Sequence, residues 1–152
     1  MDTVKIRNFR KALRRFDRLN EILNTSCCSG ITMAQCHVLL EIEEFAEITT
    51  NQLVENLKLD KSTLSRTIDK LVNGGLVGRK ISKQDRRFTF LFLTEKGKLK
   101  CDEINETNDK TYQLIFKTIS TEDPDDIVLH FKILVEALNN FIQYSDQNNK
   151  CC

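Results

Sequence analysis

The chain has 152 residues, of which 40% are hydrophobic and 30% are charged, so it is long enough for one domain with a packed core. It contains no apolar run long enough to cross a bilayer and no signal-peptide pattern at its charged N-terminus, which favours a cytoplasmic protein that does not enter a membrane. The net charge of +1 excludes a uniformly basic or acidic protein, and the six Cys of such a chain are expected to be thiols rather than disulfides.

The N-terminal residues predict a helix over residues 3–24. Apolar side chains recur there at intervals of three and four residues, and seven Lys and Arg residues occupy the opposite side. The apolar stripe is wide enough to need a partner surface, which is either another subunit or the rest of the same domain. Residues 24–32 contain Ser, Thr, Gly and the pair Cys27-Cys28, and they predict a connection.

A second helix is predicted over residues 33–45. Thr32 is its expected N-cap, because a Thr hydroxyl can accept a hydrogen bond from a free backbone N–H of the first turn. The apolar residues that we expect to face inward are Val38, Leu39, Ile42 and Phe45.

Two shorter helices follow and are separated by a tight turn at residues 58–60. The first has Thr49 or Thr50 as its cap and ends at Leu57, and the second covers residues 61–72. The Gly pair at 74–75 ends the second helix, because Gly accepts the left-handed backbone that a helix C-terminus often needs. The residues of the second helix that recur at helical spacing, and therefore face the core, are Leu64, Ile68 and Leu71.

Residues 76–81 and 88–94 predict two strands joined by a basic loop over residues 82–87. In the second strand Phe side chains share one face and Leu side chains the other, so at least one face is expected to meet a helix. Thr94 is the expected cap of a long helix over residues 95–119. A last helix is predicted from Pro124 to about Tyr144, and residues 146–152 form a polar tail.

These elements indicate a mainly α fold with a small β-hairpin wing, a winged helix-turn-helix. We expect one domain over residues 1–152, in which residues 31–97 form the DNA-binding part and residues 1–30 and 98–145 form dimerisation helices. The charge distribution agrees with this division. Residues 58–100 carry 12 Lys or Arg and four Asp or Glu, a balance of +8, and the rest of the chain carries −7. Such segregation is typical of a protein that binds nucleic acid, although charged side chains can also simply solvate a surface.

Two groups of residues are predicted to contact double-stranded DNA. The first turns of a recognition helix enter the major groove, where hydroxyls reach phosphates or base edges and Arg binds guanine. Cationic side chains at the tip of a hairpin can enter a narrow minor groove, and an Asp beside them would orient one Arg. The alternatives are an ordinary exposed helix start and a solvated turn. The predicted DNA-binding residues are Lys61, Ser62, Thr63, Ser65, Arg66, Lys83, Asp85, Arg86 and Arg87.

The run LxLDKSTLSRTIDKLVNGGLVGRK, followed by DRRxxxxxLTEKG, resembles the MarR family of multiple-antibiotic-resistance-type transcription regulators. The resemblance covers residues 31–100. It implies a homodimer built from the first and last helices, ligand pockets between the dimerisation and DNA-binding parts, and repression of a palindromic operator that a small ligand relieves. It also implies that Asp85 and Arg87 form the pair of the wing and that Arg86 assists on the DNA backbone. The Phe-rich second strand and the Ser-Lys-Gln run before Asp85 depart from the family pattern and leave the DNA sequence preference open.

The cysteines support an alternative. Thiolates are soft ligands that suit a thiophilic metal or metalloid, and they can also be oxidised. Cys27 and Cys28 are therefore candidates for a sensing site, although no CxxC pair of a structural zinc site is present and lone Cys are often buried hydrophobes. A third hypothesis is a redox or protein-interaction protein that does not bind DNA. No catalytic motif is present, so we do not expect an enzyme and assign no cofactor beyond a possible effector.

Overall fold

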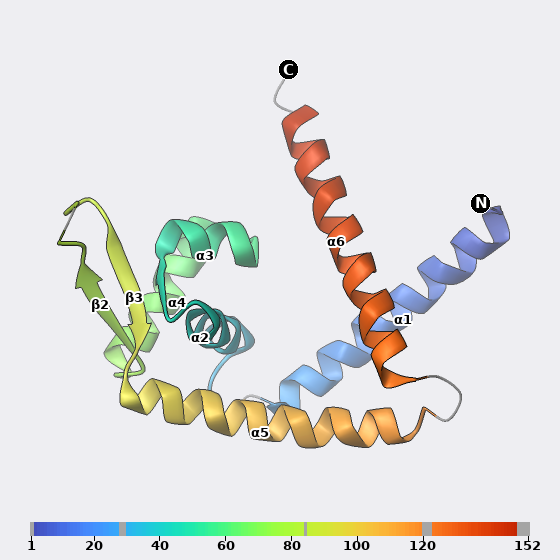
Figure 1. Ribbon diagram of the computed structural model, residues 1–152, viewed down its shortest axis with the longest axis horizontal. Coiled ribbons are helices and arrows are strands. Elements are labelled where there is room, and N and C mark those ends of the chain that lie inside the picture. The colour runs from blue at the N-terminus through green and yellow to red at the C-terminus, as the bar shows by residue number, and fades with distance from the viewer. Residues whose placement is uncertain (1, 28–29, 84, 120–122, 149–152) are drawn as a thin grey trace. The chain divides into compact units, whose positions relative to one another are not determined.

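The computed structural model describes residues 2–27, 30–83, 85–119 and 123–148 (Figure 1). The chain divides into two compact units, residues 1–109 and residues 110–152. The first unit holds α1 (Thr3–Cys27), α2 (Met33–Phe45), β1 (Glu47–Thr49), α3 (Thr50–Leu57), α4 (Lys61–Asn73), β2 (Val77–Ile81), β3 (Thr89–Leu93) and most of α5 (Glu95–Lys117). The second unit holds the end of α5 and α6 (Pro124–Asn148).

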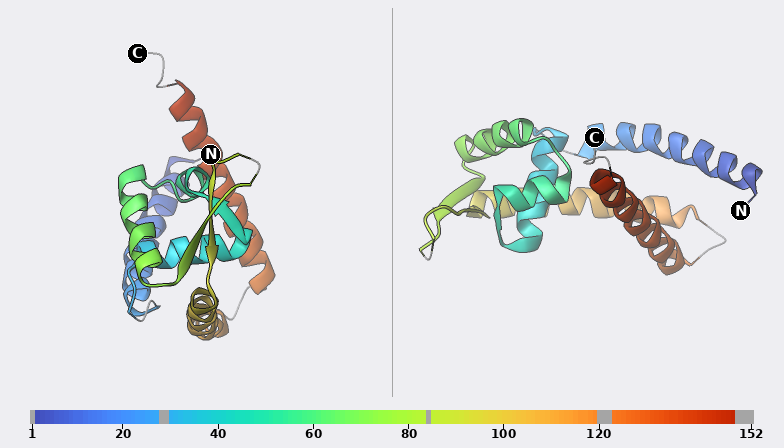
Figure 2. Two further views of the ribbon diagram at one scale, coloured as in Figure 1. Left: turned by 90° about the vertical axis from the view of Figure 1, so that its left-hand side faces the viewer. Right: turned by 90° about the horizontal axis from the view of Figure 1, so that it is seen from above.

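The winged part contains a three-stranded antiparallel sheet with the order β1-β3-β2. Ile48 pairs with Leu91 on one side of β3, and Arg79 pairs with Leu91 on the other. The hairpin of β2 and β3 lies outside helices α3 and α4, as all three views show (Figures 1 and 2). The strand β1 was not predicted, because three residues are too few to reveal an alternating pattern.

The core of the first unit forms where α2, α3 and α4 pack on one face of this sheet. Leu91 and Leu93 of β3 are buried in it, as expected of one face of that strand, whereas Phe88 is exposed. The remaining buried apolar residues are Cys36, Val38, Leu39, Ile42, Ile48, Leu53, Leu64, Ile68, Leu71, Val77, Cys101 and Ile104. Burial of about 25 cal/mol for each Å² of apolar surface makes this cluster the main stabilising contribution to the module.

The predicted caps of α2 and α3 are confirmed. Thr32 Oγ1 accepts from Gln35 N at 3.3 Å, and Gln35 Oε1 accepts from Thr32 N at 2.8 Å, so the two residues form a capping box. Thr49 and Gln52 repeat this arrangement at the start of α3. The bounds of α2 agree with the prediction, and α4 extends only one residue further, to Asn73.

Three predicted details of α1, α2 and α6 are wrong. α1 continues to Cys27, because the polar residues 24–27 are weak helix formers but not helix breakers, and Gly30 beyond it has φ +82°. α6 continues to Asn148 for the same reason, so residues 146–148 are not part of a tail. Phe45 is 50% exposed, because Ala46 takes φ 61° directly after it and turns the chain away from the core face.

The two ends of the α5–α6 connection follow from local hydrogen bonds. α5 ends at Lys117, two residues before the predicted position, because Thr118 N and Thr118 Oγ1 both donate to Ile115 O. Pro124 is the first residue of α6, as predicted, and Asp123 Oδ1 accepts from Asp125 N at 3.0 Å. No helix among the described residues is long and apolar enough to cross a bilayer.

Candidate nucleic-acid interface

Helix α4 begins on an N-cap that the sequence analysis did not assign. Asp60 Oδ1 accepts a hydrogen bond from Thr63 N at 2.8 Å and another from Ser62 Oγ at 2.6 Å. These hydrogen bonds from Ser62 and Thr63 hold the pKa of the Asp60 carboxyl well below its usual range, so the cap stays ionised where a helix N-terminus favours negative charge. An Asp directly before a predicted helix start was the available signal.

The side chains of α4 separate into a buried face and an exposed face. Leu64 and Leu71 are fully buried and Ile68 is 2% exposed, which confirms the predicted inward residues. Ser62 donates its only hydroxyl hydrogen to Asp60, so in this geometry Ser62 can only accept a hydrogen bond from a partner. The predicted contact residues of this helix are all exposed, and they are Lys61, Ser62, Thr63, Ser65 and Arg66.

The turn before α4 is held by contacts on both sides. Lys58 ends α3 with φ 52° and ψ 31°, a left-handed conformation that redirects the chain toward Asp60. Asn56 Nδ2 donates to Glu41 Oε1 at 2.8 Å and thereby ties α3 to α2. Leu53 is fully buried among the same helices. The two helices of the helix-turn-helix therefore have a defined arrangement.

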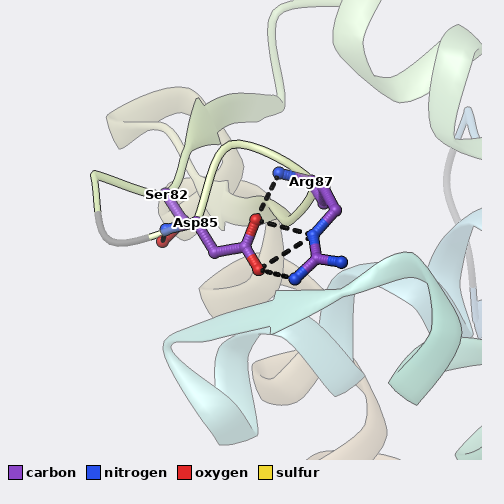
Figure 3. Close-up of polar contacts among 3 residues, drawn as sticks. All are labelled: Ser82, Asp85 and Arg87. Atoms are coloured by element: carbon purple, nitrogen blue, oxygen red, sulfur yellow. Dashed lines mark hydrogen bonds and ion pairs between the residues drawn. The ribbon is translucent and has the colours of Figure 1, made fainter.

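The hairpin loop contains the interaction that was predicted between Asp85 and an Arg (Figure 3). Arg87 Nη2 donates to Asp85 Oδ2 at 2.7 Å, and Arg87 Nε donates to both carboxylate oxygens at 3.0 and 3.1 Å. Asp85 Oδ1 also accepts from Arg87 N at 3.0 Å, and Asp85 N donates to Ser82 Oγ. The Arg87 side chain is nevertheless 87% exposed, so a fixed guanidinium is presented to solvent.

Electrostatics at the loop follow from this pair. Hydrogen bonds from Arg87 lower the pKa of the Asp85 carboxyl, and the Asp85 carboxylate raises the pKa of the Arg87 guanidinium. Lys83 and Arg86 are exposed, and neither forms an ion pair with a residue that the structure describes. The loop therefore offers three cations at one place, of which one has its orientation set by Asp85.

Two ion pairs that the sequence did not reveal connect the hairpin to the rest of the module. Arg79 Nη2 of β2 lies 2.5 Å from Asp69 Oδ1 of α4, and Lys80 Nζ lies 3.0 Å from Glu47 Oε1 of β1. Asp69 and Arg79 are ten residues apart, and the packing of β2 against α4 brings them together. The first pair joins the wing directly to the recognition helix.

The cysteines give less information. Cys27 is the last residue of α1, its side chain and all of Cys28 lie outside the described residues, and the sensing hypothesis stays a prediction. Cys36 and Cys101 are buried. Burial raises the pKa of the Cys101 thiol to about 12, and the Glu43 and Asp102 carboxylates add to this effect. No group of His, Cys, Asp or Glu within the described ranges is arranged to hold a metal ion.

A helix-turn-helix whose exposed recognition helix stands beside a basic hairpin defines the winged helix class. Residues 31–89 match the MarR family. The chain is 27% identical over 84 residues to the HTH-type transcriptional repressor MdtR of Bacillus subtilis, an alignment that covers 55% of this chain and 54% of MdtR.

Solved structures are similar to a larger part of the chain. A MarR transcriptional regulator from Methanosarcina mazei is 27% identical, with a TM-score of 0.77 over 89% of this chain and 99% of that one. A mutant MarR from E. coli, complexed with operator DNA, is 26% identical, with a TM-score of 0.61 over 84% of this chain and 95% of that one. The predicted fold class, mainly helical with a small wing, is confirmed.

Proposed function

We propose that this protein is a homodimeric repressor that binds a palindromic DNA operator and is released by a small ligand. The observation that carries the proposal is the wing, where Asp85 fixes the guanidinium of an 87% exposed Arg87 beside two further cations. A polyanion is the partner that matches this charge. The operator complex of the E. coli relative supports the same choice of partner.

In this proposal α4 enters the major groove with its first turns, where Arg66 and Ser65 reach base edges and Lys61 and Thr63 reach phosphates. Ser62 is expected to accept from a base amino group, because its own hydrogen is donated to Asp60. In the wing, Arg87 enters the adjacent minor groove while Lys83 and Arg86 neutralise phosphates. Asp85 positions Arg87 and does not contact the DNA.

Two copies are needed to read a palindrome, and both ends of the chain supply apolar surface for pairing. Within the first unit, Phe9, Phe16 and Leu19 of α1 are 46–52% exposed. Within the second unit, Phe131 and Phe141 of α6 are 48% and 68% exposed. Exposed aromatic and aliphatic side chains in such number mark an association surface. We therefore assign residues 1–30 and 98–145 to dimerisation. Sedimentation of the full chain tests whether a dimer forms, because it measures the mass of the particle.

The test of DNA binding uses a selected genomic fragment and titrations at several salt concentrations. Arg66→Ala is expected to weaken binding roughly tenfold or more and to relax the sequence preference. Arg87→Ala is expected to weaken binding. It should also lower the slope of log K against log salt by about 0.9, the value for one cation that displaces condensed counterions from the DNA. Lys117→Ala, an exposed cation outside both groups, is the control. Unchanged affinity in both Arg variants would show that this docking is wrong.

A further inference from the structure

A cleft in the first unit lies apart from the recognition helix and the hairpin tip. It has a volume of about 570 Å³, within the range of small-molecule sites. It is formed by the end of α2, the residues that follow it, β3 and the first turns of α5. Its lining residues are Ile42, Glu43, Ala46, Glu47, Phe92, Leu93, Lys98 and Asp102.

The apolar part of the cleft has one aromatic and two aliphatic walls. Phe92 is half-buried and stands on the outer face of the sheet, where its ring covers Gly78 so closely that a Cβ there would lie 2.3 Å from Phe92 Cζ. Ile42 is fully buried and Leu93 is 8% exposed, so both present only edges to the opening. A flat or bulky apolar group can pack against such a surface, and the face of Phe92 is available to a cation.

The charges of the cleft do not cancel. Glu47 is paired with Lys80 at 3.0 Å, and Lys98 is paired with Glu95 at 2.8 Å, so these two lining residues are already compensated. Glu43 accepts only a neutral amide hydrogen bond, from Asn105 Nδ2 at 3.0 Å. Asp102 forms no ion pair or hydrogen bond with any residue that the structure describes. Two carboxylates from two different helices thus remain without a cationic partner.

Both carboxylates affect the pKa of the same buried thiol, that of Cys101. The Glu43 and Asp102 charges each add to the raised pKa of Cys101, which is fully buried beneath them, after the larger effect of its burial. The two carboxylates therefore lie close enough to one another to act on a single buried group, and both also line the cleft.

We propose that this cleft binds an organic cation with an aromatic or bulky apolar body. The body lies against Phe92, Ile42 and Leu93, and the positive charge lies near Glu43 and Asp102. An anion of the same shape is disfavoured by the same two carboxylates. All lining residues of the site belong to the first unit of one chain, and the proposal needs no residue of a second copy.

The cleft also shares β1 and β3 with the sheet that carries the wing. A ligand bound in the cleft therefore contacts the same sheet that carries the wing, and through it can affect the DNA-binding surface. This part of the inference rests on the proposed function. If the module differs in conformation between free and DNA-bound states, a ligand that prefers one state changes DNA affinity, and DNA changes ligand affinity by the same factor.

Calorimetry on the full-length protein without DNA tests the site by itself. Tetraphenylphosphonium is the probe, and tetraphenylborate is its counterpart of matched shape and opposite charge. We expect tetraphenylphosphonium to bind and the double variant Glu43→Gln/Asp102→Asn to weaken its binding roughly fivefold or more, because two exposed carboxylate–cation attractions are lost. Glu44→Gln/Asp109→Asn removes one charge from each of the same two helices outside the cleft and should leave binding unchanged.

A third variant separates a charge effect from damage to the fold. Lys98→Gln removes the only cation of the lining and should tighten tetraphenylphosphonium binding, which no merely unfolded variant would do. Equal binding by the parent and by Glu43→Gln/Asp102→Asn would overturn the proposal, as would tetraphenylborate binding that depends on the same cleft. Titration of operator DNA in the presence of tetraphenylphosphonium then measures the coupling. A protein that never binds DNA would refute the proposed function and leave the calorimetric result intact.

Discussion

Gly97 sits where α5 crosses the backbone that leads into β2, and its replacement by Ala should destabilise the first unit. A Cβ at this position would lie 2.1 Å from Leu76 O, 3.1 Å from Leu76 C and 3.3 Å from Leu93 Cδ2. Ordinary contact begins at 3.4 Å, so the helix start and the Leu76 carbonyl must separate by about 1.3 Å. The carbonyl is not free to move, because Leu76 O accepts from Thr94 N at 3.0 Å and the adjacent Gly75 O accepts from Thr94 Oγ1 at 2.6 Å.

The cost of Gly97→Ala follows from these contacts. Weakening two hydrogen bonds costs about 1 kcal/mol each, and overpacking adds about 1–3 kcal/mol. Ala is a better helix former than Gly by about 1 kcal/mol, which offsets part of the loss. The expected net destabilisation is about 2–4 kcal/mol, or roughly 5–15 °C in melting temperature for a chain of this length.

Thermal and urea unfolding followed by circular dichroism measure the effect of Gly97→Ala. Gly30→Ala is the matched control, because Gly30 has φ +82° and no atom within 4 Å of its Cβ position, so only the left-handed backbone opposes the change. That control should lose about 1 kcal/mol. If Gly97→Ala proves as stable as Gly30→Ala, the close approach of α5 to Leu76 does not constrain the fold as described.

Three further outcomes are expected. Ala46→Gly should stabilise the protein by about 0.5–1 kcal/mol in urea unfolding, because Ala46 has φ 61° and Gly adopts this conformation without strain; a loss of stability would contradict this. The stability at alkaline pH should show the effect of Cys101, whose pKa is raised from 9.0 to about 12 in the folded protein. The thiol therefore ionises at lower pH in the unfolded chain than in the folded one, and the free energy of unfolding falls by about 1.4 kcal/mol per pH unit from pH 9 toward 12. Cys101→Ala should lack this part of the slope, and identical pH profiles would exclude the thiol as its source. Asp60→Ala should lower both the melting temperature and the DNA affinity, since Ser62 and Thr63 lose their acceptor. Asp60→Asn should retain most of the melting temperature and most of the DNA affinity. Equal losses in the two variants would show that the charge of Asp60 matters and not the cap.

The helices and their caps could be predicted because their causes are local. Thr32 and Thr49 precede apolar patterns with a Gln three residues later, and each forms the capping box that this spacing favours. The Asp85–Arg87 pair was also predictable, because two residues of one short loop cannot lie far apart. In both cases the partners are separated by two or three residues, so the sequence contains the whole interaction.

The parts that could not be predicted depend on contacts between distant residues. β1 exists because Glu47 and Thr49 pair with Phe92 and Phe90, more than forty positions away, and three residues carry no pattern of their own. The Arg79–Asp69 pair and the cleft beside Phe92 arise only once the sheet and α5 are assembled. The exposure of Phe45 has a similar origin, since it depends on the turn at Ala46 and not on helical periodicity.

Thr49 belongs to two structures at once, and this determines how the module can respond to a signal. The residue pairs with Phe90 in the sheet, and its side chain caps α3 through Gln52. Thr49 therefore joins α3, the first helix of the helix-turn-helix, to β3 of the wing, and the Arg79–Asp69 pair makes a second connection between the wing and α4. A movement of the wing relative to the recognition helix has to break at least one of these two contacts. Control of DNA binding must then come from a rotation of the whole module or from a weakening of one of these two contacts. A mutation at either contact should change how DNA binding responds to a ligand before it changes the fold.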